Sequence, residues 1–313
     1  MKRFIKTRSL NRMVKEPEEI MQLSEENYSA YVEEAVRMML DSPEKHVVLL
    51  SGPSGSGKTT TALRIVGRIE EMGGQASVIS MDNYFLPASE FEHRDIPRDE
   101  NGNIDLESPQ RLDIPLFCEH LEKLAMGQEV QMPLFRFADQ SRRGYTPLQR
   151  SEGEYIIIEG IHALNPIVTG AVDEYCSKIF VSVNTRVRDD EGEMLCARHI
   201  NLLRRLCRDS LFRKRGLRET FSMLRSVTRG EQLYIMPFRN RADIRVDTFM
   251  PFELSVYKHV LYQSLREDHD ALCGYDAYNF IMRFLEEIDP VDPEYVWKNS
   301  IVREFIGGSE LEY

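Results

Sequence analysis

The sequence lacks the features of a disulfide-stabilised, membrane-spanning or secreted protein. Its five cysteines are an odd number and include no C-x-x-C pair, which argues against both a disulfide framework and a zinc site. No stretch approaches the run of roughly 18 apolar residues that a membrane helix needs. The N-terminus is charged throughout and has no apolar core of the kind found in a secretion signal. We therefore expect a cytoplasmic protein without a membrane partner.

An excess of positive charge is also missing. The chain has 51 acidic and 40 basic residues, which gives a net charge of −11 at pH 7. Proteins that hold nucleic acid by its phosphates usually carry net positive charge or a long basic face. The main basic cluster, residues 198–218, is local and better suited to a small polyphosphate. We therefore expect a small-molecule substrate and no nucleic-acid partner.

Apolar runs separated by glycine-rich or polar stretches predict a parallel α/β domain. Hydrophobic residues make up 42% of the 313-residue chain, enough for a buried core. Continuous apolar runs at 46–51 and 155–159 are typical of strands covered on both faces. Further elements are predicted as strands at 76–81 and 178–183, and as helices at 24–41, 59–72 and 116–125. This order of strands and helices is typical of the start of a parallel α/β domain. We expect three parts: a helical extension at 1–44, the catalytic domain at 45–250 and a helical extension at 251–313.

Residues 52–59, GPSGSGKT, match the phosphate-loop pattern G-x-x-x-x-G-K-[ST] at every defined position. Glycines let successive backbone N–H groups converge on a phosphate, and the following helix directs its positive end at the same anion. A chance glycine-rich turn could match, but this match lies between a predicted buried strand and a predicted helix. The motif predicts ATP or GTP with Mg²⁺, with Lys58 serving the β- and γ-phosphates and Thr59 the metal. The expected cofactor-binding residues are Gly52, Ser54, Gly55, Ser56, Gly57, Lys58, Thr59 and Thr60.

Two carboxylates follow predicted strands. Asp82 comes directly after the strand at 76–81, and Glu159 ends the strand at 155–159. Because the carboxyl ends of parallel strands face the ligand crevice, both should approach Lys58. Asp82 could accept the proton of an attacking hydroxyl or help to hold Mg²⁺, and Glu159 could bind Mg²⁺. The alternatives are a turn-forming Asp-Asn pair and a surface glutamate at a strand end.

The basic cluster follows helical spacing. Arg204 and Arg208 are four residues apart and share one face, while Arg205 points elsewhere. A charge run is usually a solvated face. In a phosphotransferase, however, lid arginines stabilise the transferred phosphate, and a lid excludes water. We therefore favour an arginine-bearing lid at 196–218.

The motifs GPSGSGKTT, SMDNYF, IIIEGIHALNP, RRLCRD and NRADI resemble, in order and spacing, the uridine kinase/phosphoribulokinase family. The resemblance covers about residues 46–260, and residues 302–309 are similar to the end of a bacterial uridine-kinase-like branch. It implies a P-loop NTPase fold, with a parallel sheet flanked by helices in a nucleoside-kinase-like arrangement, and an enzyme that phosphorylates a nucleoside 5′-hydroxyl. It also implies a homo-oligomer, because uridine-kinase-like enzymes often form one.

The resemblance also implies roles for individual residues. Asp82 would be the base for the nucleoside 5′-hydroxyl and, with Thr59 and Glu159, would serve Mg²⁺. The lid residues near the phosphates would be Arg204, Arg208 and Arg213, with Arg215 approaching the substrate. The segment 104–109, IDLESP, looks like the family segment whose first aspartate holds the ribose hydroxyls, and the alternative is a solvated loop acid. The expected substrate residues are Asp82, Tyr84, Asp105, Phe135, Gln140 and Arg215.

The chain departs from the family pattern in the hairpin near 130–145, which resembles the base-reading hairpin of uridine kinases. Phe135 and Gln140 stand where that family normally has a tyrosine and a histidine. Loss of a hydroxyl and an imidazole changes the hydrogen bonds that the pocket can offer. Uridine or cytidine is therefore only the default acceptor, and a purine is conceivable.

Three other functions stay open. A kinase of another small alcohol, such as a sugar phosphate, would use the lid arginines for a substrate anion. A regulatory NTPase is disfavoured because the chain has neither N-K-x-D nor L-S-G-G-Q and is acidic. A degenerate kinase retained for binding is disfavoured by the intact Lys58, Thr59, Asp82 and Glu159.

Overall fold

A five-stranded, all-parallel sheet forms the centre of the computed structural model, which describes residues 4–94, 96–98, 102, 104–136 and 139–312. In spatial order its strands are β10 (Ile244–Asp247), β7 (Cys176–Ser182), β2 (Val47–Ser51), β6 (Tyr155–Glu159) and β3 (Ala76–Ser80). All residues of β2 and β6 are buried, as expected for central strands covered on both faces. The four predicted strands are present, and β10 was not predicted.

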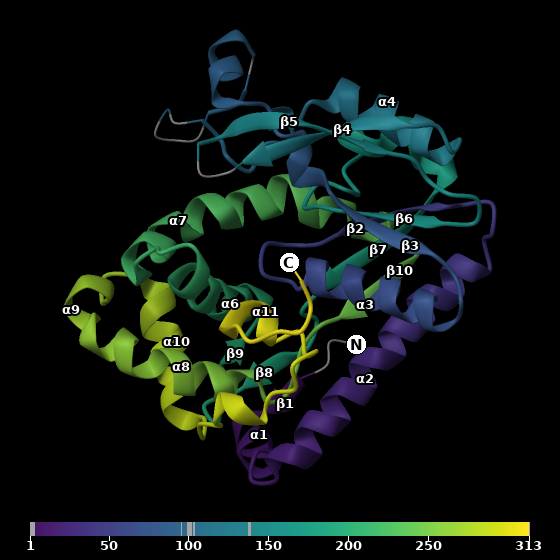
Figure 1. The fold of residues 1–313 in the computed structure, drawn as a ribbon. Coiled ribbons are helices and arrows are strands. Elements are labelled where there is room, and N and C mark those ends of the chain that lie inside the picture. Colours follow the sequence, from purple (N-terminus) through teal and green to yellow (C-terminus); the bar gives the residue numbers. More distant parts are fainter. Residues whose placement is uncertain (1–3, 95, 99–101, 103, 137–138, 313) are drawn as a thin grey trace.

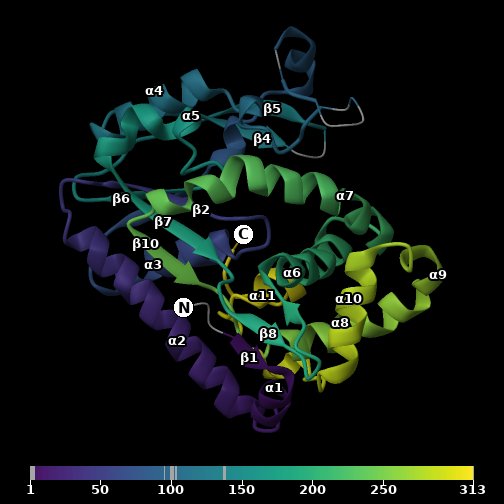
Figure 2. The same ribbon diagram turned by 180° about the vertical axis from the view of Figure 1, so that it is seen from behind.

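Helices cover the two faces of this sheet (Figures 1 and 2). Side chains that alternate along β2 enter different cores: Val48 and Leu50 enter one, and Val47 and Leu49 the other. The first core contains residues of α2 and α3, and the second contains residues of α4 and α5. The helices have these bounds: α2 (Pro17–Leu40), α3 (Lys58–Glu71), α4 (Ile114–Ala125) and α5 (Pro166–Thr169). The parallel sheet flanked by helices is therefore confirmed.

A second group of helices packs beside the sheet (Figure 1). Its members are α6 (Ala197–Phe212), α7 (Leu217–Gly230), α8 (Glu253–Glu267), α9 (His269–Leu272), α10 (Asp276–Glu287) and α11 (Arg303–Ile306). Buried residues of α6, α8 and α10 belong to the same core as those of α2 and α3. The helices that follow residue 251 thus pack against the same core as the sheet.

The N-terminal region is not purely helical. Strand β1 (Phe4–Lys6) pairs in parallel with β8 (Arg186–Arg188), and β8 pairs with β9 (Met194–Leu195). Helix α1 (Thr7–Met13) follows, and Asn11 Nδ2 donates to the carbonyl oxygen of Glu287 at 2.6 Å. The prediction of a helical extension is therefore wrong for residues 4–6, and α1 contacts the end of α10.

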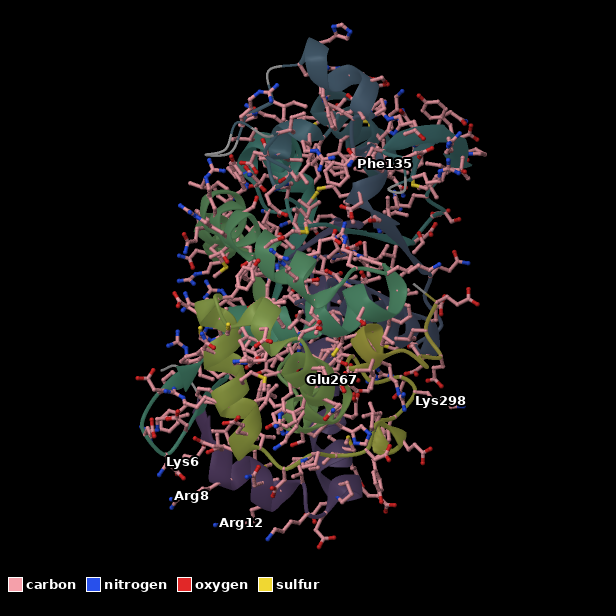
Figure 3. The ribbon with its side chains drawn as sticks, turned by 90° about the vertical axis from the view of Figure 1, so that its left-hand side faces the viewer. Lys6, Arg8, Arg12, Phe135, Glu267 and Lys298 are labelled. Carbon is pink, nitrogen blue, oxygen red and sulfur yellow. The ribbon has the colours of Figure 1, made fainter. Side chains whose placement is uncertain are left out.

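The hairpin predicted near 130–145 is formed by β4 (Val130–Arg136) and β5 (Ser141–Leu148), which pair antiparallel. It lies at one end of the molecule, with Phe135 far from Lys6, Arg8 and Arg12 at the other (Figure 3). Short turns connect the remaining elements: 3₁₀ helices at Met81–Tyr84, Ala88–His93, Pro109–Arg111, Gly170–Tyr175, Met236–Arg241 and Pro293–Tyr295, and a π-helical turn at Glu231–Ile235. Within the described residues, every helix is too short or too polar to cross a membrane.

A buried ion pair joins α6 to α8 beneath the phosphate loop. The Arg204 and Glu253 side chains have no exposed surface, and Arg204 Nε donates to Glu253 Oε2 at 2.8 Å. The same guanidinium donates to the carbonyl oxygens of Gly55 at 3.1 Å and Thr248 at 2.6 Å, and it lies 5.1 Å from the Phe305 ring centroid. Because water cannot replace a lost partner here, this pair should be sensitive to removal of one charge.

We expect Glu253→Gln to lower the free energy of unfolding by about 3–5 kcal/mol, because it leaves the Arg204 charge buried without its counterion. Urea denaturation monitored by circular dichroism measures this loss. The control is Glu119→Gln, which removes an exposed bridge to Lys123 and should change stability little. Equal losses in the two variants would contradict a special role for the buried pair.

Candidate active site

The phosphate loop between β2 and α3 is formed as the motif predicts. A Cβ on Gly52 would lie 2.0 Å from the carbonyl oxygen of Val181, so only glycine allows this approach. Gly55 and Gly57 have φ angles of 80° and 84°, the left-handed region that glycine adopts readily. Lys58 begins α3, and its Nζ donates to the carbonyl oxygen of Pro53 at 3.1 Å, across the loop. The result is a glycine backbone beside a helix N-terminus, which favours anions.

Asp82 and Glu159 meet beside Lys58. Asp82 lies in the turn after β3, and Glu159 ends the adjacent strand β6, paired in register with Ser80. Burial raises the pKa of Asp82, and the Lys58 charge opposes that rise. Burial also raises the pKa of Glu159, opposed by Lys58 and reinforced by the Asp82 charge. The two carboxylates are therefore close to each other and to Lys58, and both are partly desolvated.

This donor set fits Mg²⁺. Magnesium is usually held by one or two carboxylates together with substrate phosphates and water. Asp82, Glu159 and the hydroxyl of Thr59 on the first turn of α3 supply hard oxygen ligands, and a dication would relieve the repulsion between the two acids. Among the described residues there is no cluster of three or more acidic, histidine or cysteine ligands. A metal here would thus depend on the bound phosphates for part of its coordination.

The end of α6 brings arginines to Asp82. The charges of Arg213 and Arg208 both act on the Asp82 carboxyl and lower its pKa against the effect of burial. Asp209 gathers the arginines: its carboxylate lies 3.7 Å from Arg208, 3.4 Å from Arg213 and 4.0 Å from Arg215. Arg215 also pairs with Glu219 on α7 at 3.4 Å. Arg208 and Arg213 thus lie at the site, while Arg215 is held between α6 and α7.

The assignment of Arg204 to the lid requires correction. Its guanidinium is enclosed by Glu253 and backbone carbonyls, so it supports the loop from below and cannot reach a bound phosphate. Arg205 lies near Glu231 and Glu107 instead, and burial lowers its pKa against their charges. Its buried Nε and Nη1 have no hydrogen-bond partner within the described residues. Helical spacing predicts that Arg204 and Arg205 lie on different sides of α6. It does not predict which side faces the site, because α6 is buried on both sides.

Asp105 lies at the site's edge with its oxygens already engaged. It is buried, and Oδ2 accepts from Arg229 Nη1 at 2.7 Å and from the Tyr234 hydroxyl at 3.1 Å. Oδ1 accepts from the Glu107 backbone N–H at 3.1 Å. A Cβ on Gly230 would lie 2.2 Å from Glu107 Cβ, so the segment 104–109 packs directly on the end of α7. The alternative of a solvated loop acid is therefore wrong, and the contact of Asp105 with a substrate ribose stays a prediction.

Glu107, Arg229 and Glu231 are the residues that sequence reasoning missed. Burial and the Glu231 charge raise the pKa of Glu107 to about 7. Burial also raises the pKa of Glu231, which Arg205 opposes. A glycine–glutamate pair at the end of a helix was the only signal for this cluster, and nothing in the linear order connects it to residue 107.

Phe135 and Gln140 of the hairpin form a cluster with Phe85 and Arg111, which we call the aromatic cluster. The rings of Phe135 and Phe85 have centroids 5.8 Å apart, and the Phe135 N–H donates to Asn83 Oδ1 at 3.3 Å. Arg111 lies over Phe85 with its guanidinium carbon 4.8 Å from the ring centroid. Its Nη2 donates to Gln140 Oε1 at 3.4 Å, and Gln140 itself has a φ angle of 48°. Phe135 and Gln140 are therefore brought together with two residues of the segments after β3 and before α4.

Tyr84 does not belong to this aromatic cluster. It is buried, its hydroxyl pairs with His120 Nδ1 at 3.1 Å, and its ring packs edge-on against Phe117 at 4.9 Å. These contacts place it in the core beneath α4, because the turn after β3 directs Asp82 and Tyr84 to different sides. The predicted substrate contact of Tyr84 is therefore wrong.

A cavity of about 730 Å³ borders the phosphate loop at Pro53. Its walls come from the ends of β7 and β10, the start of α6 and the turn after α7, and they include Arg198, Arg245, Asn201 and Glu231. This volume is in the range of small-molecule sites.

Together, the sheet, the phosphate loop and the carboxylates beside it define a P-loop phosphotransferase. The model of the Phosphoribulokinase / Uridine kinase family matches residues 47–253, more than half of the chain. The chain therefore belongs to this family, whose members are P-loop kinases that phosphorylate a small hydroxyl-bearing molecule.

Individual relatives agree with the family. A uridine kinase from Borrelia duttonii (strain Ly) is 30% identical over 200 residues, which are 63% of this chain and 84% of that protein. A uridine kinase from Staphylococcus aureus (strain JH9) is 28% identical over 200 residues, covering 63% and 85%. Among solved structures, D-glycerate 3-kinase from Cryptococcus neoformans var. grubii serotype A is a distant likeness, with 16% identity and a TM-score of 0.33 over 88% of this chain and 87% of that one.

The raised pKa of Glu107 predicts a pH-dependent stability. The ordinary value is 4.5 and the folded value about 7, so the folded protein binds this proton more tightly. Its contribution is fully present below about pH 4.5 and is lost as the pH rises through about 7. We expect Glu107→Gln, which cannot ionise, to gain about 2–3 kcal/mol relative to wild type between pH 4.5 and 8.

Urea denaturation at several pH values measures this gain. The control is Glu152→Gln, which changes an exposed glutamate in the turn before β6 and should follow wild type throughout. A constant difference between Glu107→Gln and wild type would mean that Glu107 titrates as an ordinary surface acid.

Proposed function

We propose that this chain transfers the γ-phosphate of ATP or GTP, with Mg²⁺, to the 5′-hydroxyl of a nucleoside. The observation that carries the proposal is the position of Asp82, which lies close enough to Lys58, Arg208 and Arg213 for their charges to act on it. The next residue, Asn83, accepts a hydrogen bond from the hairpin. A hydroxyl bound between the aromatic cluster and the phosphate loop would meet Asp82 and the phosphates together.

Each residue of the site has a defined task in this reaction. The loop amides and Lys58 hold the phosphates, and Arg208 and Arg213 stabilise charge on the transferred group. Asp82 accepts the proton of the attacking hydroxyl as the new O–P bond forms and the bond to the leaving diphosphate breaks. Its raised pKa brings proton affinity closer to the working pH. Bound Mg²⁺, held by Thr59 and Glu159 with Asp82, would neutralise charge on the phosphates.

The aromatic cluster supports a nucleoside as acceptor. Phe135 is half-buried and can offer part of its ring to a base, while Phe85 is buried against it and beneath Arg111. Because Gln140 Oε1 already accepts from Arg111, its amide N–H groups are the side that can donate to a base carbonyl. Carbonyl groups are common to uracil, cytosine and guanine, so this donor fits the family's pyrimidine default and guanine alike.

A second candidate is a kinase of a phosphorylated alcohol. The buried Nε and Nη1 of Arg205 find no hydrogen-bond partner in the described part of the chain, and an acceptor phosphate would supply one. The two candidate functions differ in whether the acceptor molecule already carries a phosphate group.

The test is incubation with Mg-ATP, and separately Mg-GTP, against a panel of nucleosides, sugar phosphates and other small alcohols, with products detected by mass. We expect a nucleoside monophosphate. Asp82→Asn should lower its rate of formation about 10²- to 10⁴-fold, the range for loss of a general base, while triphosphate binding is largely kept.

The matched control is Asp190→Asn, which alters an exposed carboxylate paired with Arg8 beside the small sheet and should leave turnover unchanged. Equal loss of binding and turnover in Asp82→Asn would show that Asp82 serves the metal or the fold rather than the proton. Products from sugar phosphates alone would replace the nucleoside proposal with the second candidate.

A further inference from the structure

A segment near the C-terminus lies directly against the phosphate loop. We name residues 299–306 the loop-contacting segment; it includes α11, which both ribbon views show beside α6 (Figures 1 and 2). Glu304 Oε2 accepts from the Thr60 hydroxyl at 2.5 Å and from the Thr60 backbone N–H at 3.4 Å. A carboxylate thus occupies donors of the loop itself.

Buried apolar contacts flank Glu304 on both sides. Ile301 has no exposed surface, and a Cβ on Gly57 would lie 2.1 Å from Ile301 Cδ1. The Phe305 ring lies 5.1 Å from the guanidinium carbon of Arg204, which itself bonds the loop. The carboxylate is therefore seated by its neighbours and is not a mobile surface side chain that happens to reach Thr60.

The donors that Glu304 takes are of the kind that bind phosphate. Thr60 is the third residue of α3, and the N–H groups of a first helical turn have no partner within the helix. Such groups, next to the positive end of the helix, are where a phosphate loop receives the phosphates. Glu304 thus satisfies Thr60 with an anion from the chain itself, and a second anion at the same donors would be repelled.

We propose that Glu304 is an internal ligand of the phosphate loop, and that it must leave Thr60 before a nucleoside triphosphate can bind with all its phosphates in place. This rests on the proposed use of a triphosphate by the loop. The segment acts as a competitor whose release sets the apparent affinity for the nucleotide.

Hydrogen bonds tie the loop-contacting segment to the residues on either side of it and to α3. Arg303 Nη2 donates to the carbonyl oxygens of Pro293 at 2.9 Å and Val296 at 2.7 Å, and its Nη1 donates to Gly307 at 3.2 Å. The carbonyl oxygen of Asn299 accepts from Arg64 on α3 at 3.0 Å. Withdrawal of Glu304 should therefore loosen neighbouring residues as well, which hydrogen exchange can detect.

The first experiment measures equilibrium binding of Mg-ADP and of inorganic tripolyphosphate by the full chain, without any acceptor. We expect Glu304→Gln to bind both about 3- to 30-fold more tightly than wild type, the range for removal of a competing charge at a helix N-terminus. The matched control is Glu310→Gln, which removes the same charge from an exposed position a few residues away and should bind as wild type does.

The second experiment needs no variant. Hydrogen exchange over residues 299–307 of the wild-type chain should become faster when Mg-ADP or tripolyphosphate is added. Weaker binding by Glu304→Gln, or slower exchange on ligand addition, would overturn the proposal and make Glu304 part of the nucleotide site. Unchanged binding and exchange would overturn it as well.

These results are separable from the proposed function. Binding is measured without an acceptor, so failure to phosphorylate any nucleoside leaves the expected tightening intact. If neither wild type nor Glu304→Gln binds ADP or tripolyphosphate, the phosphate loop has no such ligand, and both proposals fall together.

Discussion

The phosphate loop imposes the constraint on which the rest of the structure depends. A loop whose backbone N–H groups must face an anion is rich in glycine, so it has few side chains of its own to fix its conformation. Residues from other segments fix it instead, and the glycines let these residues approach the loop backbone closely. The neighbours come from four parts of the chain: Val181 of β7, Arg204 of α6, Thr248 after β10 and Ile301 before α11. This explains why the helices after residue 251 share a core with the sheet.

The same arrangement concentrates charge where water is scarce. Glu159 is buried and Asp82 and Glu107 are half-buried, and desolvation raises the pKa of each. The positive charges of Lys58, Arg208 and Arg213 offset part of the free energy that desolvation of Asp82 costs. Acids that hold protons above their ordinary range suit proton transfer and metal binding, and they store free energy that a bound cation or ligand can release. The site therefore concentrates carboxylates, and the carboxylate of Glu304 at Thr60 adds a further one.

Sequence reasoning succeeded where the signal was local and failed where partners were distant. The strands, the phosphate loop and the placement of Asp82 and Glu159 beside Lys58 followed from short motifs and from the geometry of parallel sheets. The direction of the Arg204 side chain, however, depends on its ion pair with Glu253, which is 49 residues away. Tyr84 turned into the core, although it lies two positions from Asp82, because a tight turn sends neighbouring side chains in different directions.

By itself, the sequence determined which backbone segments form and what chemistry they carry. Glycine spacing, apolar runs and the lysine of the motif act within a few residues, so their consequences can be derived in linear order. Only the tertiary structure decided which charges became desolvated, which arginine entered the site, and that Glu304 bonds Thr60 across 244 residues. Those outcomes depend on contacts between segments with no local pattern in common, and packing alone brings them together.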